Sequence, residues 1–268
     1  MKTFEFNPTE NSCAVAYLHT PLTEMDNYRK EFPVVVVLPG GGYEYCSVRE
    51  GDPIAFEYFT AGYNVILLKQ YSVKENASQY RPLLDVYNTI QTIRKNAEEW
   101  NCSDKIAVCG FSAGGHLAAS SGVMWNKPEV LNRLTSWDVD HKPNAMILSY
   151  PVILANEYAH EGSIRYVSGA VPGTEEYKYW SIDTHVTSDC CPAFLWHTVT
   201  DASVPVENTL AMLNALQRNH ISYECHLFPE GKHGLSICSE ETGSYEPYNS
   251  RWMEMSIQWL NKQFNHRK

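Results

Sequence analysis

The sequence has no apolar run near the roughly 20 residues that a membrane-spanning helix requires. Positive charge is also scarce, because 21 lysines and arginines face 31 aspartates and glutamates, which gives a net charge of −10. An acidic chain is poorly suited to bind the phosphate backbone of a nucleic acid. We therefore expect neither a membrane protein nor a nucleic-acid-binding protein.

Cysteine is too sparse for a disulfide scaffold. Eight cysteines are scattered through 268 residues, and none of them forms a C-x-x-C pair. The N-terminus lacks the apolar centre of a signal peptide and carries Glu5 and Glu10. These absences predict reduced thiols and a cytoplasmic location.

Sequence motifs for cofactors and metals are missing as well. The glycines near residues 40 and 110 do not form G-x-G-x-x-G, and His116 stands after Gly115 where a P-loop has lysine. The sequence has no H-E-x-x-H motif and no Cys/His cluster with zinc spacing. We expect no cofactor and no metal.

The sequence does contain short runs of apolar, often β-branched residues. Such runs are continuous rather than alternating, which is typical of strands covered on both faces in a parallel sheet. The expected strands are 34–38, 64–68, 105–110, 145–148, 193–196 and 223–228, and the first 20 residues are expected to add one or two edge strands.

Helical patterns lie between these runs, at 53–60, 81–97, 114–123, 205–218 and 252–264. Pro205 suits the first position of its helix. Strands and helices in alternation predict an α/β fold. We expect one domain over residues 1–268, with a mostly parallel, twisted sheet of about eight strands and helices on both faces.

Residues 153–191 do not follow this alternation. The segment is rich in tyrosine, glycine and charge, and it is too long for an ordinary connection. Two interpretations remain open at this point. The segment is either a surface loop with one or two short helices or a small cap-like insertion that builds part of a substrate pocket.

Residues 110–114 read Gly-Phe-Ser-Ala-Gly, which matches G-x-S-x-G. The motif alone is weak, but here it follows an expected strand and opens an expected helix, the setting that a nucleophilic serine needs. Side chains at positions 110 and 114 would clash with the neighbouring backbone. Ser112 would then project from the carboxyl end of the sheet, and we predict that it is a nucleophile.

A serine hydroxyl needs a base, and the base needs a carboxylate that orients it. His233 is the best base, because it lies in a glycine-flanked loop after the last expected strand. Asp201 follows the expected strand 193–196. The chain order Ser112, Asp201, His233 is that of an α/β-hydrolase triad.

The other candidates for these two roles are weaker. His116 is close to Ser112 in the sequence but lies one turn along the helix, so it is expected to pack or to face the surface. Asp189 precedes its strand, whereas Asp201 follows it. Structural roles are expected for His185, His197 and His226.

Residues 39–43 read Pro-Gly-Gly-Gly-Tyr and follow the expected strand 34–38. Glycine runs also occur in plain turns, but glycines let backbone N–H groups approach a substrate oxygen closely. We predict that Gly41 and Gly42, together with Ala113, form the oxyanion hole. Tyr43 and Tyr45 are expected either to line the pocket or to pack.

The chain resembles α/β-hydrolases of the bacterial esterase and lipase group related to acetylxylan esterases. The resembling segments are 38–43, 81–85, 110–118, 149–152, 194–208 and 228–235. Lipase-like relatives usually carry His-Gly-Gly-Gly, whereas this chain has Pro39 in place of the histidine, as in carbohydrate acetyl esterases. The resemblance implies a serine esterase for short-acyl esters of carbohydrates such as acetylated xylo-oligosaccharides.

The same triad would also serve a general carboxylesterase or lipase, an aryl formamidase or a small peptidase. Outside the enzymes, the alternative is a hydrolase-fold binding module without catalysis. The expected partner is a small-molecule ester, and a homodimer is a possible assembly. The aromatic residues between Tyr158 and Trp180 are expected either to stack on a sugar or to cover the core.

Overall fold

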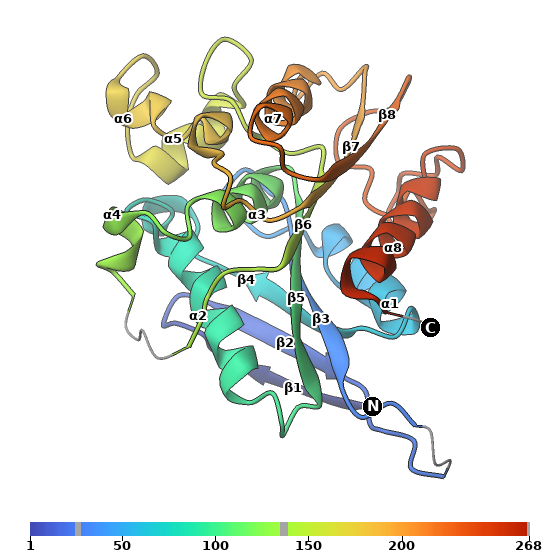
Figure 1. The fold of residues 1–268 in the computed structure, drawn as a ribbon. Coiled ribbons are helices and arrows are strands. Elements are labelled where there is room, and N and C mark those ends of the chain that lie inside the picture. Colours follow the sequence, from blue (N-terminus) through green and yellow to red (C-terminus); the bar gives the residue numbers. More distant parts are fainter. Residues whose placement is uncertain (25–27, 135–138, 267–268) are drawn as a thin grey trace.

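The computed structural model describes residues 1–24, 28–134 and 139–266, which build an eight-stranded sheet flanked by helices (Figure 1). The order of the strands in the sheet is β1-β2-β4-β3-β5-β6-β7-β8. The strands are β1 (Lys2–Phe6), β2 (Cys13–Leu18), β3 (Phe32–Leu38), β4 (Asn64–Gln70), β5 (Cys102–Phe111), β6 (Ala145–Ser149), β7 (Ala193–Thr198) and β8 (Tyr223–Phe228).

The sheet is parallel from β4 to β8 and antiparallel only where β1 and β2 join it. A short turn connects β1 to β2, so these strands pair as a hairpin, whereas parallel neighbours need a longer crossover. The predictions of a mostly parallel sheet and of edge strands in the first 20 residues are confirmed.

The burial of the strands follows their place in the sheet. All seven residues of β3, in the middle of the sheet, are buried. The expectation of full cover is wrong for β8, most of which is only partly buried. The reason is its position, because β8 lies at the edge and pairs with β7 alone.

Helices cover the two faces of the sheet with separate apolar clusters (Figure 1). On one face, α1 (Asp52–Thr60) and α8 (Arg251–Phe264) pack their apolar side chains. On the other face lie α2 (Arg81–Lys95), α3 (Ala113–Val123) and α7 (Glu207–Arg218). Shorter helical elements are η1 (Val48–Glu50), η2 (Lys74–Asn76), α4 (Pro128–Leu131), α5 (Glu161–Ser168), α6 (Glu175–Lys178) and η3 (Ile182–His185).

The helix expected at 205–218 begins two residues later, as α7. The N–H of Asn208 donates to the carbonyl of Pro205 at 3.0 Å, which closes a turn before the helix proper. Pro205 therefore belongs to the loop that carries Asp201 rather than to the first helical turn.

Residues 153–191 contain α5, α6 and η3. Tyr177 and Trp180 in this segment are almost fully buried, and both belong to the apolar cluster that α2 and α3 share. These two aromatic rings cover the core rather than a ligand site. Among the described helices, none is long and apolar enough to cross a membrane.

Candidate active site

Ser112 lies between β5 and α3, on a tight turn that requires glycine at positions 110 and 114. Its backbone has φ 53° and ψ −115°, in a region that L-residues rarely adopt. A Cβ on Gly110 would lie 2.0 Å from the carbonyl oxygen of Gly114, and a Cβ on Gly114 would lie 2.2 Å from the carbonyl oxygen of Leu38. The structure thus confirms that a side chain at position 110 or 114 would clash with the neighbouring backbone.

Ser112, His233 and Asp201 meet at the carboxyl edge of the sheet, where the loops after β5, β7 and β8 converge. His233 Nε2 lies 2.8 Å from Ser112 Oγ, and His233 Nδ1 lies 2.6 Å from Asp201 Oδ2. Because Asp201 accepts the Nδ1 proton, Nε2 is left as the acceptor for the serine hydroxyl. The three predicted residues therefore form one hydrogen-bonded chain.

Both oxygens of Asp201 are fixed by the protein. Oδ1 accepts the N–H groups of Ser203 and Val204, each at 2.9 Å. Burial alone would raise the pKa of this carboxyl group, but hydrogen bonds from His197 and His233 outweigh burial and hold the pKa well below its usual range. Asp201 is therefore a carboxylate aimed at the imidazole.

The glycine loop lies against the same pocket. Gly41 and Gly42 both line it and have φ values of +124° and +68°, which favour glycine. Ala113 is the first residue of α3, and the first N–H groups of a helix have no acceptor within the helix. Among the described residues, no hydrogen bond uses the N–H groups of these three. Their role as an oxyanion hole remains a prediction.

Glu50, which no feature of the sequence singled out, is a buried carboxyl group that holds the glycine loop in place. Its Oε2 accepts the Gly40 N–H at 2.8 Å, and its Oε1 accepts the Tyr150 hydroxyl at 2.6 Å. Tyr150 in turn accepts the Ser236 N–H at 3.0 Å and packs edge-on against His233. Burial raises the pKa of Glu50, while these hydrogen bonds oppose the rise. No local motif marks this residue, because its two hydrogen-bond partners lie 10 and 100 positions away in the sequence.

The pocket in front of Ser112 has a volume of about 280 Å³. Tyr45 lines it and is 59% exposed. Tyr43, the other expected pocket residue, is fully buried, and its hydroxyl bonds His116 Nδ1 at 2.9 Å. Of the two interpretations left open for Tyr43, packing is the one that the structure shows, because the turn at Gly41 and Gly42 directs this side chain into the core.

His160 is a second pocket residue that sequence reasoning did not find. It precedes α5, in the segment 153–191, and lines the same pocket as Ser112 and His233. The segment thus contributes His160 to the lining of the pocket, while its role as a cap stays a prediction. The only sequence signal was the unusual length of the segment.

The remaining histidines that competed for the base have structural partners. His116 donates from Nε2 to the carbonyl of Trp180 at 3.0 Å, and His197 bonds the Thr209 hydroxyl at 2.7 Å. His185 lies against the Tyr179 carbonyl, and His226 against Glu224. None of these four, and not Asp189, lines the pocket of Ser112 within the described part of the chain.

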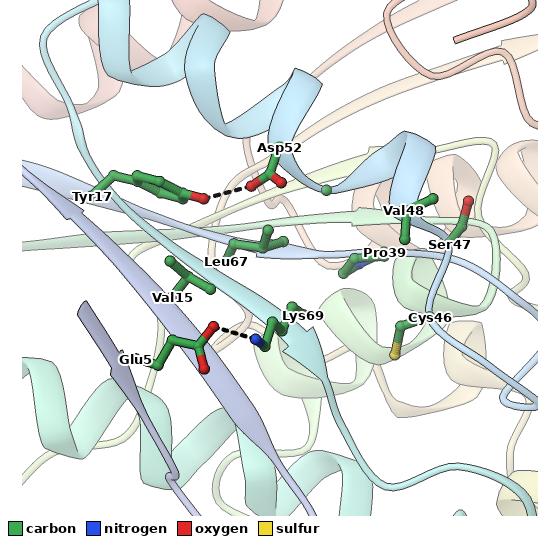
Figure 2. A pocket seen from close by; sticks show the side chains of 11 residues that line it. Glu5, Val15, Tyr17, Pro39, Cys46, Ser47, Val48, Asp52, Leu67 and Lys69 are labelled. Atoms are coloured by element: carbon green, nitrogen blue, oxygen red, sulfur yellow. Dashed lines mark hydrogen bonds and ion pairs between the residues drawn. The ribbon is translucent and has the colours of Figure 1, made fainter. Parts of the chain in front are cut away.

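Figure 2 shows another pocket, beside β2, β4 and η1. Its polar groups pair with one another, since the Tyr17 hydroxyl donates to Asp52 at 2.5 Å and Lys69 pairs with Glu5. It contains no nucleophile next to a base, so it is not the candidate active site. In residues 1–24, 28–134 and 139–266, no group of three histidine, cysteine or acidic side chains is placed to hold a metal ion.

Comparison with known proteins gives the family. The BD-FAE family model matches residues 22–216. The chain is 36% identical over 235 residues to endo-1,4-beta-xylanase B of Butyrivibrio fibrisolvens, which covers 84% of this chain and 35% of the relative. It is 28% identical over 246 residues to acetylxylan esterase of Xylanibacter ruminicola, which covers 84% of this chain and 45% of the relative. The chain thus spans less than half the length of these two curated relatives.

A solved structure aligns with this chain over a larger share of both proteins. The acetyl ester-xyloside bifunctional hydrolase of Caldicellulosiruptor lactoaceticus superimposes with a TM-score of 0.82 and 31% identity, covering 96% of this chain and 89% of the other. The resemblance stated from the motifs is confirmed. The chain belongs to the BD-FAE family, an esterase group with the α/β-hydrolase fold that resembles the acetylxylan esterases.

Proposed function

We propose that this protein is a serine esterase that removes short acyl groups, above all acetyl, from carbohydrate esters such as acetylated xylo-oligosaccharides. The observation that carries the proposal is the hydrogen-bonded chain of Ser112, His233 and Asp201 beside two glycines with positive φ. This arrangement meets the requirements of acyl transfer through a serine.

The reaction proceeds in two halves. His233 Nε2 takes the proton of Ser112 Oγ as the oxygen attacks the ester carbonyl, and N–H groups of Gly41 or Gly42 and of Ala113 bind the oxyanion. The intermediate collapses, His233 gives the proton to the leaving alcohol, and Ser112 keeps the acyl group. Water, deprotonated by His233, then attacks the acyl-serine and releases the carboxylic acid. The restored Ser112 hydroxyl takes back the proton.

The chemistry of the pocket supports a short acyl group and a polar alcohol. Besides the triad, the glycines, Tyr45 and His160, the described lining consists of serine, arginine and glutamate. A long acyl chain would find no aliphatic wall to bury its methylene groups, each of which gains about 0.8 kcal/mol on burial. The names of the relatives, an acetylxylan esterase and an acetyl ester-xyloside hydrolase, point to the same class.

Hydrolysis of p-nitrophenyl esters from acetate to octanoate, run beside acetate release from acetylated xylo-oligosaccharide, tests the proposal. We expect a preference for acetate, release of acetate from the sugar, and loss of both activities in Ser112→Ala. A preference for long chains would instead support a general carboxylesterase. Turnover of formamides or peptides but not of esters would contradict the proposal.

A further inference from the structure

His160 places a second imidazole in the pocket of Ser112, and the mechanism above does not use it. The residue is half-buried and immediately precedes α5. A Cβ on Gly42 would lie 3.7 Å from His160 Cε1, so the ring adjoins the glycine loop. The imidazole therefore reaches the part of the pocket where substrate must lie.

The start of α5 sets which nitrogen of His160 carries the proton. Nδ1 lies 2.8 Å from the Ser163 hydroxyl and accepts the Ser163 N–H at 3.3 Å, as the N-cap of the helix. A nitrogen that accepts a backbone N–H has no proton of its own in the neutral ring. The proton is therefore on Nε2, which has no hydrogen-bond partner among the described residues.

The surroundings favour the neutral ring. Burial lowers the pKa of His160, positive charge on His233 lowers it further, and the negative charge of Asp201 opposes the shift without reversing it. His160 thus offers one N–H donor rather than a cation. Among the described residues the one buried side-chain donor or acceptor without a partner is Ser72 Oγ, so Nε2–H is open to the pocket, where a hydroxyl oxygen of a ligand can take the place of water as its acceptor.

We propose that His160 Nε2–H donates a hydrogen bond to a hydroxyl oxygen on the alcohol portion of the substrate, next to the ester, and so selects polyhydroxylated alcohols. The inference rests on the proposed esterase function and names what recognises its substrate class. The carbonyl oxygen already has donors in Gly41, Gly42 and Ala113, and the leaving oxygen has His233. The neighbouring hydroxyl is the polar group of a sugar ester that still needs a partner.

The test compares two acetates that differ by one hydroxyl group, the monoacetate of trans-cyclohexane-1,2-diol and cyclohexyl acetate. For the unchanged protein we expect kcat/KM to be about tenfold or more higher for the diol monoacetate, because a site built to bind a hydroxyl rejects the analogue that lacks it. The ratio of the two values is the readout.

Two variants separate the donor from the helix cap. His160→Asn keeps a good N-cap for α5 but is too short to place a donor where Nε2 lies, whereas His160→Ala removes both. We expect the ratio to fall close to one in both variants, while the Tm of His160→Asn stays nearer to that of the unchanged protein. His226→Gln, at a histidine on the edge strand outside the pocket, is the matched control and should keep the ratio.

The outcomes distinguish the inference from the function on which it rests. If His160→Asn preserves both the ratio and the two kcat/KM values, His160 acts only as a cap, and the inference is overturned. Equal losses on both acetates would place His160 on the carbonyl side and would also overturn it. If the unchanged protein hydrolyses neither acetate in a Ser112-dependent way, the proposed esterase function fails, and the inference fails with it.

Discussion

At the residue scale, the carboxylate of Asp201 has two roles. One oxygen closes the turn through the N–H groups of Ser203 and Val204, and the other receives His233. The residue that closes this turn and the carboxylate of the triad are thus one and the same. A rigid carboxylate orients the imidazole better than a mobile one would.

Asp201→Asn is expected to lower kcat by about 10³–10⁴-fold with little change in fold. The amide can donate to Nδ1, which would hold the imidazole in the tautomer that cannot accept the serine proton. Steady-state kinetics on p-nitrophenyl acetate measures the effect. Asp189→Asn, which alters an exposed carboxylate outside the pocket, is the control. Equal kcat values for the two variants would contradict the role of Asp201.

The residue scale also shows what the sequence can predict about a site. Ser112 could be predicted because a side chain on either of the nearby glycines would clash with the local backbone. Asp201 and His233 could be predicted because each follows a strand that ends at the same edge of the sheet. The sequence could not show which of Tyr43 and Tyr45 lines the pocket, since a shift of two residues along a turn decides whether a side chain points into the core or into the pocket. His160 was missed because its place in the pocket comes from the folding of a long irregular segment.

At the scale of elements, Glu50 and Tyr150 tie three loops together. The glycine loop is held through Gly40, the loop after β6 provides Tyr150, and the loop of His233 is held through Ser236. This bridge keeps the glycine N–H groups and the base in a fixed relation to each other. Such a bridge could not be predicted from the sequence, because it joins residues about 100 and 86 positions apart.

Tyr150→Phe is expected to reduce the free energy of unfolding by about 2–3 kcal/mol, because Glu50 loses a donor and the Ser236 N–H loses its acceptor inside the core. We also expect kcat to fall by about tenfold or more, since small misplacements of reacting groups are costly. Urea denaturation and ester kinetics measure the two effects. Tyr248→Phe, at an exposed tyrosine, is the control, and a Tyr150→Phe variant that behaves like it would refute the bridge.

His116 links α3 to two other parts of the chain, through the hydroxyl of Tyr43 and the carbonyl of Trp180. Burial lowers its pKa from 6.5 to about 4. Between these pH values the unfolded chain binds more protons than the folded one, so the free energy of unfolding falls as the pH drops. The full loss is ~3 kcal/mol, reached near pH 4.

Urea denaturation at pH 7 and at pH 4.5 tests this linkage with His116→Gln, which cannot titrate. The variant is expected to lose less stability between the two pH values than the unchanged protein. Some pH dependence should remain, because burial also lowers the pKa of His266 to about 4. An unchanged pH dependence would show that His116 is not the titrating group.

At the scale of the whole molecule, one sheet separates two apolar clusters, and residues 153–191 add Trp180 and Ile182 to the cluster around α2 and α3. The alternation of apolar runs and helical patterns predicted this architecture. The edge position of β8 did not follow from it, because a run of residues does not reveal how many neighbours its strand has.

A single domain over residues 1–268 is expected to protect the irregular segment as well as the sheet. Amide hydrogen exchange followed by mass spectrometry should find peptides that cover 177–185 protected to a similar degree as peptides from α2. The buried Tyr177 and Trp180 are the reason for this expectation. Exchange of 177–185 within seconds, while α2 stays protected, would instead make the segment a separately opening cap.

The proposed mechanism requires that Ser112 is a nucleophile activated by His233 and Asp201, and labelling with a fluorophosphonate tests this directly. The intact mass should rise by one adduct, peptide mapping should place it on Ser112, and Ser112→Ala should not react. Labelling of His233→Ala should be slower by several orders of magnitude. An unlabelled protein, or an adduct on another residue, would contradict the account.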